Sequence, residues 1–381
     1  MLIFVCPVVL DFTIFCVLFA VSYGAGERGM SLLQCAWLVG ILQISYMVTS
    51  LTIGLFLLRR NARAMLIASA AASGLVAVCC LAGTRFWPLF AGMTLMGLFT
   101  GVFFNAFQTF MRGEAPPGGL ARVTGFYTLA WSLGAAFGLL MASGLYRMGP
   151  RALSALTLAA VGVVVFLLAR HRPRPSHAPS ADEHVEEGPE GARRVDPRYV
   201  WIGWIMIFTA MFVQRPIQTF YPAISARLGV APVLAGLPLF LHMVMQGAGG
   251  WGMIRLRGVL YRRLPLCLVQ AGCAGLLLAL WRVPSYWLSA IGISVLGVWA
   301  GFAYFCAVYY ASNSGRRSLN IGVNEFLVGL GSFVSLFAAE RCMKAAGDEA
   351  MYAVCAVAVL VSVAAQWLIA TAAGRRPAPP A

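Results

Sequence analysis

The sequence predicts an all-α integral membrane protein with twelve transmembrane helices in two six-helix halves. Of its 381 residues, 60% are hydrophobic and 11% are charged, and the mean hydropathy of +0.81 is too high for a soluble chain to hide in one core. Twelve stretches are long and apolar enough to cross a hydrocarbon core of about 30 Å, which needs roughly 20 helical residues. One long polar segment, residues 171–198, separates the first six stretches from the last six.

The expected helices follow these apolar runs in order, and charged residues, glycine or proline stand at or near the ends of each run. In the first half the helices are expected at 2–24, 32–58, 64–82, 87–110, 121–146 and 150–169. In the second half they are expected at 199–223, 231–254, 264–281, 286–311, 320–339 and 349–373.

This pattern divides the chain into four parts. Residues 1–170 are expected to form the N-terminal six-helix half, and residues 199–373 the C-terminal six-helix half. Residues 171–198 are rich in Pro, Gly, Ser and charge, with too few apolar residues to offset the entropy of ordering, so we expect a disordered cytoplasmic linker. Residues 374–381 are expected to form a cytoplasmic tail.

The distribution of positive charge predicts the orientation. If the N-terminus is cytoplasmic, few basic residues fall in outer loops: Arg28, Arg85, Arg147, Arg151, Arg227, Arg282, Arg341 and Lys344. The other arginines, apart from Arg215 within a span, fall on the inner side, where positive charge is retained during insertion. We therefore expect a multi-pass protein of the plasma (inner) membrane with both termini in the cytoplasm. Because these arginines are spread over many short loops, the net charge of +15 does not indicate a nucleic-acid surface.

Motifs of catalysis or cofactor binding are missing from the sequence. The ten cysteines include no CxxC pair and no zinc-ligand spacing. There is no nucleophile with a base at motif spacing and no G-x-x-x-x-G-K-[ST] phosphate loop. We expect no metal, no cofactor, no enzymatic activity and no direct drive by ATP.

The two halves show weak local similarity to each other. Residues 125–134, GFYTLAWSLG, align without gaps to residues 322–331, GVNEFLVGLG, in the fifth and eleventh spans. Residues 54–59 end the second span as residues 250–255 end the eighth, and an arginine-rich turn follows each. The halves are therefore interpreted as parallel copies of one six-helix unit.

The two six-helix halves, the long central loop and the inner termini resemble the major facilitator superfamily (MFS). That family carries a signature between helices two and three: Gly, three residues, Asp-Arg, one residue, then Gly-Arg-Arg. Gly54, Arg59 and Arg63 match the signature, and Leu58 stands where the family has Asp. Two further positions depart from it, Asn61 and Ala62.

The resemblance implies a substrate site near the bilayer midplane, exposed to each side in turn as the halves rock. It implies that the first, fourth, seventh and tenth helices line the cavity, with the second, fifth, eighth and eleventh beside them. Ionisable side chains cost about 2.5 to 3.5 kcal/mol each at the centre of a span and usually face a cavity or a partner. The clear cases within spans are Asp11, Arg215, His242 and Glu325.

Each of these four residues has a second interpretation. Asp11 could be an acid at a helix end, and Arg215 could extend to the outer interface. His242 could be a neutral core histidine bonded to a neighbouring carbonyl. Glu325 could form a structural pair with a cytoplasmic arginine.

Uncharged polar residues complete the candidate cavity. The substrate-binding candidates among them are Asn105, Gln108, Tyr127, Gln218 and Asn324, and further polar or aromatic candidates are Gln43, Tyr46, Trp131, Gln214, Gln246, Tyr304 and Tyr309. Such side chains also tie helices together in membrane bundles. Together they favour a solute with polar and flat or apolar parts.

A cytoplasmic gate is expected at the second-to-third and eighth-to-ninth loops. Four arginines crowd the inner face there: Arg59, Arg63, Arg255 and Arg257. Because Leu58 replaces the family's Asp, Glu114 or Glu325 is expected to supply the missing carboxylate. The alternative is that these arginines only set the topology and meet lipid phosphates.

We therefore expect a secondary active transporter of a small organic solute that works by alternating access. Proton coupling is favoured over sodium because protonatable groups occur in the spans and no carbonyl-rich broken helix is evident. The expected partners are a small-molecule substrate, protons and the lipid bilayer, with no nucleic acid, and the expected state is a monomer. The alternative is a transport-inactive membrane sensor or assembly partner, which the degraded signature favours.

Overall fold

The helices of the computed structural model account for nearly all of the residues it describes, which are 4–53, 57, 59–114, 120–171, 198–283, 285–312 and 317–373. Within these ranges, 12 helices are long and apolar enough to cross a membrane. The first half contains α1 (Val5–Glu27), α2 (Leu32–Ile53), α3 (Arg59–Ala82), α4 (Phe86–Glu114), α5 (Leu120–Leu145) and α6 (Pro150–Arg170). The second half contains α7 (Arg198–Arg227), α8 (Pro232–Gly252), α9 (Arg263–Arg282), α10 (Tyr286–Ser312), α11 (Arg317–Ala346) and α12 (Ala350–Ala373).

The predicted all-α membrane fold is confirmed, and the differences lie at helix ends. Helix α11 continues to Ala346 instead of residue 339, α7 continues to Arg227 instead of 223, and α3 begins at Arg59 instead of 64. An apolar run marks only the part of a helix that suits hydrocarbon. The backbone can continue its helical hydrogen bonding through charged turns beyond that part, so these three helices extend past their apolar runs.

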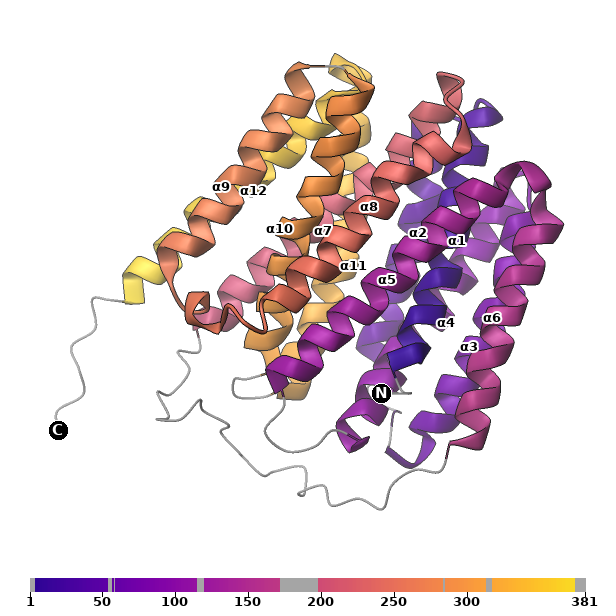
Figure 1. Ribbon diagram of the computed structural model, residues 1–381, viewed down its shortest axis with the longest axis horizontal. Coiled ribbons are helices and arrows are strands. Elements are labelled where there is room, and N and C mark those ends of the chain that lie inside the picture. Colours follow the sequence, from indigo (N-terminus) through magenta and orange to yellow (C-terminus); the bar gives the residue numbers. More distant parts are fainter. Residues whose placement is uncertain are drawn as a thin grey trace.

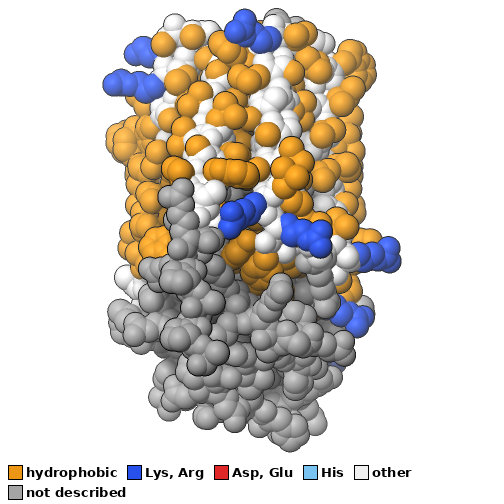
Figure 2. All heavy atoms as spheres, turned by 90° about the vertical axis from the view of Figure 1, so that its left-hand side faces the viewer, with side chains coloured by type: hydrophobic (Ala, Val, Ile, Leu, Met, Phe, Trp, Pro, Cys, Tyr) orange, Lys and Arg blue, Asp and Glu red, His pale blue; other side chains and the backbone are white. Residues whose placement is uncertain are grey.

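The outer surface of the bundle suits a lipid environment. Figure 2 shows one side of the molecule, where hydrophobic side chains cover the middle and Lys and Arg side chains gather toward the ends of the described surface. Helices α9 and α12 expose large apolar residues, including Leu264, Leu268, Val361 and Leu368, each at least 60% accessible. A contiguous apolar surface of this kind would be unfavourable in water and is expected against acyl chains.

Helices of the two halves meet along a central seam (Figure 1). Helix α1 packs against α7, α2 against α11, and α5 against α8. Because consecutive helices alternate in direction, α1 and α7 begin, and α6 and α12 end, on the same side of the bundle. We call this side the linker end, since it holds Arg170 and Arg198 at the borders of the linker.

The local sequence repeat corresponds to a repeated helix contact. In α5, a Cβ atom on Gly134 would collide with the carbonyl oxygen of Val8 in α1. In α11, a Cβ atom on Gly331 would lie 2.5 Å from the carbonyl oxygen of Phe208 in α7. Gly134 and Gly331 are the paired last residues of the aligned segments, so the same close approach is built at equivalent places in the two halves.

Candidate functional site

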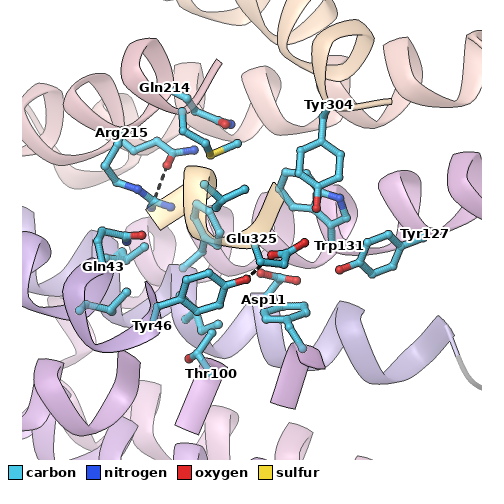
Figure 3. A pocket seen from close by; sticks show the side chains of 18 residues that line it. Asp11, Gln43, Tyr46, Thr100, Tyr127, Trp131, Gln214, Arg215, Tyr304 and Glu325 are labelled. Atoms are coloured by element: carbon cyan, nitrogen blue, oxygen red, sulfur yellow. Dashed lines mark hydrogen bonds between the residues drawn. The ribbon is translucent and has the colours of Figure 1, made fainter. Parts of the chain in front are cut away.

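A cavity of about 90 Å³ lies on the seam between the two halves (Figure 3). Seven helices line it: α1, α2, α4 and α5 of the first half, and α7, α10 and α11 of the second. Its lining residues are Asp11, Ile14, Phe15, Leu18, Leu42, Gln43, Tyr46, Thr100, Phe104, Tyr127, Trp131, Met211, Gln214, Arg215, Gln218, Tyr304, Glu325 and Val328. The two carboxyl groups and the guanidinium among them come from both halves.

Glu325 connects the halves through a hydrogen bond. Its carboxylate accepts from the hydroxyl of Tyr46, which lies on α2 in the other half. One helical turn beyond Glu325, Gly329 allows α11 to approach α2, because a Cβ atom there would lie 2.9 Å from Cβ of Met47. Glu325 is 4% exposed, so its charge depends on neighbouring groups rather than on bulk water.

Asp11 is the acid of the first half in the cavity. It is 5% exposed, and its Oδ2 atom is buried without a hydrogen-bond partner. Gly134 and Gly138 of α5 pack against the backbone of Val8 and Phe12 in α1. Val8 lies about one helical turn before Asp11, and Phe12 directly follows it. Asp11 interacts electrostatically with Arg215 and Glu325, so the three charged groups share one electrostatic environment.

Arg215 points into the cavity from α7. Its Nη1 donates to Oε1 of Gln218 at 3.1 Å, while its Nε is buried without a partner. Arg215 and Asp11 do not form an ion pair within 4.0 Å, so their charges interact over a longer distance. The alternative that Arg215 extends to the outer interface does not match this placement.

A proline next to Arg215 interrupts the backbone hydrogen bonding of α7. Pro216 has no N–H group and leaves the carbonyl of Phe212 without its helical donor. The thiol of Cys355 in α12 lies 3.8 Å from that carbonyl oxygen and supplies a weak donor. In membrane helices such replacement donors make an internal proline tolerable, and here the proline follows a cavity residue directly.

Aromatic rings form one wall of the cavity beside the acids. The rings of Trp131 on α5 and Tyr304 on α10 lie 4.8 Å apart, a contact that again joins the two halves. Tyr304 interacts electrostatically with Tyr127, Glu325 and Asp11, which places these side chains together. In Figure 3 this group lies on one side of the cavity, and Arg215 lies on the other with Gln43 and Gln214.

Three predicted site residues lie outside the cavity lining, two of them buried and Asn105 partly buried. Asn105 donates through Nδ2 to Ser50 Oγ at 3.2 Å and to the carbonyl of Gly101 at 2.8 Å, so it ties α4 to α2. Asn324 is 1% exposed. His242 lies in α8, which contributes no residue to the lining described. The side chain of Gln108 lies outside the described part of the structure.

The hydrogen bonds of His242 match those of a neutral core histidine. Its Nδ1 lies 2.7 Å from the carbonyl oxygen of Ile293, which can only accept, so Nδ1 carries the proton. Its Nε2 lies 3.1 Å from Nε2 of Gln214, which can only donate, so that ring nitrogen accepts. Both ring nitrogens are thereby satisfied.

The expected gate is only partly described. Arg63 donates through Nε to the carbonyl of Leu168 at 2.9 Å and through Nη2 to that of Ala169 at 2.7 Å. It therefore caps the last carbonyls of α6 within its own half. Arg255 lies 5.3 Å from the ring of Trp251. The remaining proposed gate side chains lie outside the described residues: Arg59, Glu114 and Arg257.

The two halves are in close contact at the end of the bundle opposite the linker end. A Cβ atom on Gly26 of α1 would collide with the carbonyl oxygen of Ala223 in α7. The hydroxyl of Tyr23 donates to the carbonyl of Val230 at 2.7 Å. Arg227 of the second half donates to the carbonyl of Met30 in the first half at 2.7 Å. These contacts join the end of α1 to the end of α7 and their following turns.

The sequence did not single out the remaining cavity residues. Thr100 and the apolar lining residues, such as Phe15 and Met211, are of types that occur throughout every span. Only the contacts between helices decide which of them face the seam. No run of residues in the sequence carries that information.

Comparison with known proteins identifies the family. The sequence description of the Major Facilitator Superfamily matches residues 1–336. No curated protein matches the chain. Among solved structures, a bacterial homologue of the human lysosomal transporter Spinster, in an inward-facing and occupied conformation, has the same fold, with a TM-score of 0.65 at 14% identity. That likeness covers 99% of this chain and 98% of the other. Because the family match spans most of its length, this chain belongs to the Major Facilitator Superfamily of membrane transporters.

Proposed function

We propose that this protein carries a small organic solute across the membrane by alternating access, with protons as the coupling ion. The cavity on the seam is the observation that carries the proposal. It is lined from both halves, so relative movement of the halves would change its exposure. It also holds the side chains of Asp11, Arg215 and Glu325, whose charges are costly within a bilayer and mark pathways for solutes or protons.

The charges of the cavity support coupling to protons. With Asp11 and Glu325 ionised and Arg215 protonated, the lining carries one excess negative charge. One bound proton makes the lining neutral, and a neutral cavity is less costly to close off from water than a charged one. Asp11 and Glu325 are the proposed proton carriers, and His242, with both ring nitrogens bonded, is a weaker candidate.

The contacts at the end opposite the linker support a conformation closed on that side. Under the predicted orientation this side is outer, so the cavity would next open to the cytoplasm. The expected gate at Arg59, Arg63, Arg255 and Arg257 would close the inner side in the other conformation, with Glu114 or Glu325 as the carboxylate. We propose that the protein works as a monomer, since one chain supplies both halves of the cavity.

Reconstituted protein should take up a solute against its gradient when a pH gradient is imposed. The test is a screen of vesicles with a mixture of labelled metabolites, with and without a proton ionophore. Uptake that the ionophore abolishes supports the proposal. If correctly inserted protein moves no solute in either direction, the transport-inactive interpretation replaces it.

Residues 171–198 and Ala381 should lie in the cytoplasm of a cell whose plasma membrane holds the protein. In a cysteine-free background, an impermeant maleimide applied to intact cells should miss a cysteine at Ser180 and label one at Lys344, which is exposed at the end of α11. Labelling of Ser180 before the membrane is permeabilised would reverse the proposed orientation.

A further inference from the structure

We propose that the cavity binds a small zwitterion that carries an ammonium group and a carboxylate, as an amino acid does. This inference rests on the proposed function, whose substrate class it names. Its basis is the way charge and unsatisfied hydrogen-bonding atoms are distributed between two sides of the cavity. The acidic side holds Asp11, Glu325 and the ring pair of Trp131 and Tyr304, and the basic side holds Arg215 with neutral amides (Figure 3).

The basic side is built to receive an anionic group. Arg215 donates one hydrogen bond, from Nη1, to the neutral amide oxygen of Gln218, and its Nε–H group is buried without a partner. A buried donor of this kind costs free energy until something accepts from it. Arginine presents its donors in a planar fork that matches a carboxylate. Asp11 is not within 4.0 Å, so it does not fill that role.

The acidic side is built to receive a cation. The Oδ2 atom of Asp11 is buried without a donor, and the neighbouring Glu325 adds a second carboxyl group. The rings of Trp131 and Tyr304 stand in the same region, and aromatic faces attract ammonium groups. An ammonium ion placed here would supply the donor that Oδ2 lacks.

A ligand with a single charge would satisfy only one of the two sides. An organic cation would leave Nε of Arg215 without an acceptor, and an organic anion would leave Oδ2 of Asp11 without a donor. A zwitterion serves both sides and adds no net charge, so the cavity can still retain one proton. The cavity volume of about 90 Å³ limits the ligand to a compact molecule, since a cavity of roughly 150 Å³ holds benzene.

Equilibrium binding to the purified protein in lipid nanodiscs tests this proposal. The probes are glycine, β-alanine, γ-aminobutyrate, δ-aminovalerate and ε-aminocaproate, a series in which the two charges are progressively separated. Each is compared with its methyl ester, which keeps only the positive charge, and its N-acetyl derivative, which keeps only the negative charge. At least one zwitterion should bind, and both of its derivatives should bind at least about 30-fold more weakly, because each leaves a buried charged group unpaired.

Variants assign the two sides. Arg215→Gln should remove the preference for the zwitterion over its methyl ester, and Asp11→Asn should remove the preference for the zwitterion over its N-acetyl form. A merely structural role would weaken all probes together and leave these ratios unchanged. The matched control is Arg282→Gln, at the end of α9 with its guanidinium 4.5 Å from the Trp281 ring, which should leave both ratios as in the wild type.

Several results would overturn the inference. A methyl ester or an N-acetyl form that binds as tightly as its zwitterion would show a site for a single charge, and failure of the whole series to bind would reject an amino-acid-like ligand. Binding is measured without transport, so the two proposals fail separately. Zwitterion binding without uptake would reject the transport proposal alone, and coupled uptake of some other solute without zwitterion binding would reject this inference alone.

Discussion

Replacing Asp11 with Asn, or Glu325 with Gln, should abolish solute accumulation driven by a pH gradient while exchange of solute across the membrane continues. Either change makes the charged lining of the cavity neutral without a proton, because one carboxylate then balances Arg215. Translocation would no longer require a proton to be bound. With one proton per solute, a gradient of one pH unit can support about tenfold accumulation, which should fall to about unity in either variant.

Vesicles loaded with the solute identified by the uptake screen provide both measurements. Accumulation is followed under an imposed pH gradient, and exchange is followed as counterflow of labelled solute with no gradient. The matched control is Glu340→Gln, because Glu340 is a buried acid on the same helix as Glu325 and does not line the cavity. If both cavity variants accumulate solute as the wild type does, proton coupling through these carboxyls is wrong. Loss of counterflow as well would indicate a structural role.

The charged part of the candidate cavity could be predicted from the sequence because a bilayer makes such residues conspicuous. Asp11, Arg215 and Glu325 each stand in an otherwise apolar run, and their burial is costly without a cavity or a partner. All three line the same cavity. The same rule also selected His242, whose partner is the carbonyl of Ile293 on α10. The sequence does not say which carbonyl faces a histidine, since that depends on how α8 and α10 pack.

Depth along a helix was less predictable than the presence of the helix. One interpretation of the sequence was that Arg215 extends to the outer interface. Helix α7 continues to Arg227, so Arg215 lies further from the helix end than the apolar run suggested. The hydrogen bond from Arg215 to Gln218 then holds the guanidinium at the cavity. The hydropathy of α7 gives no information about the position of the helix end or the direction of the Arg215 side chain.

The glycine repeat shows how a weak sequence signal acquires meaning from contacts. Small residues at helix interfaces are common, so the match of Gly134 with Gly331 alone was modest support for two equivalent halves. In the structure both residues allow a close helix contact: Gly134 that of α5 with α1, and Gly331 that of α11 with α7. The signature at residues 54–63 allows no such test, because residues 54–56 and 58 and the side chain of Arg59 lie outside the described part of the chain.

Replacing Gly26 with Val should abolish transport and leave the cavity open to the outside. At this position α1 and α7 touch backbone to backbone, and any Cβ atom would collide with the carbonyl oxygen of Ala223. A rotamer change cannot relieve a collision with backbone, so the halves must separate there. If overpacking costs about 3 kcal/mol, the conformation closed on this side becomes about 100-fold less populated.

Two measurements follow the opening that Gly26→Val should cause. Solute uptake by vesicles should fall to background, and a cysteine at Leu18, a cavity residue on α1, should become reactive in intact cells toward an impermeant maleimide. The matched control is Gly144→Val, because Gly144 is an exposed residue near the same end of the bundle with no atom within 4 Å of its would-be Cβ. That variant should transport solute and keep the Leu18 position protected. Wild-type uptake by Gly26→Val, or protection of the Leu18 position in it, would mean that the contact between α1 and α7 need not close during transport.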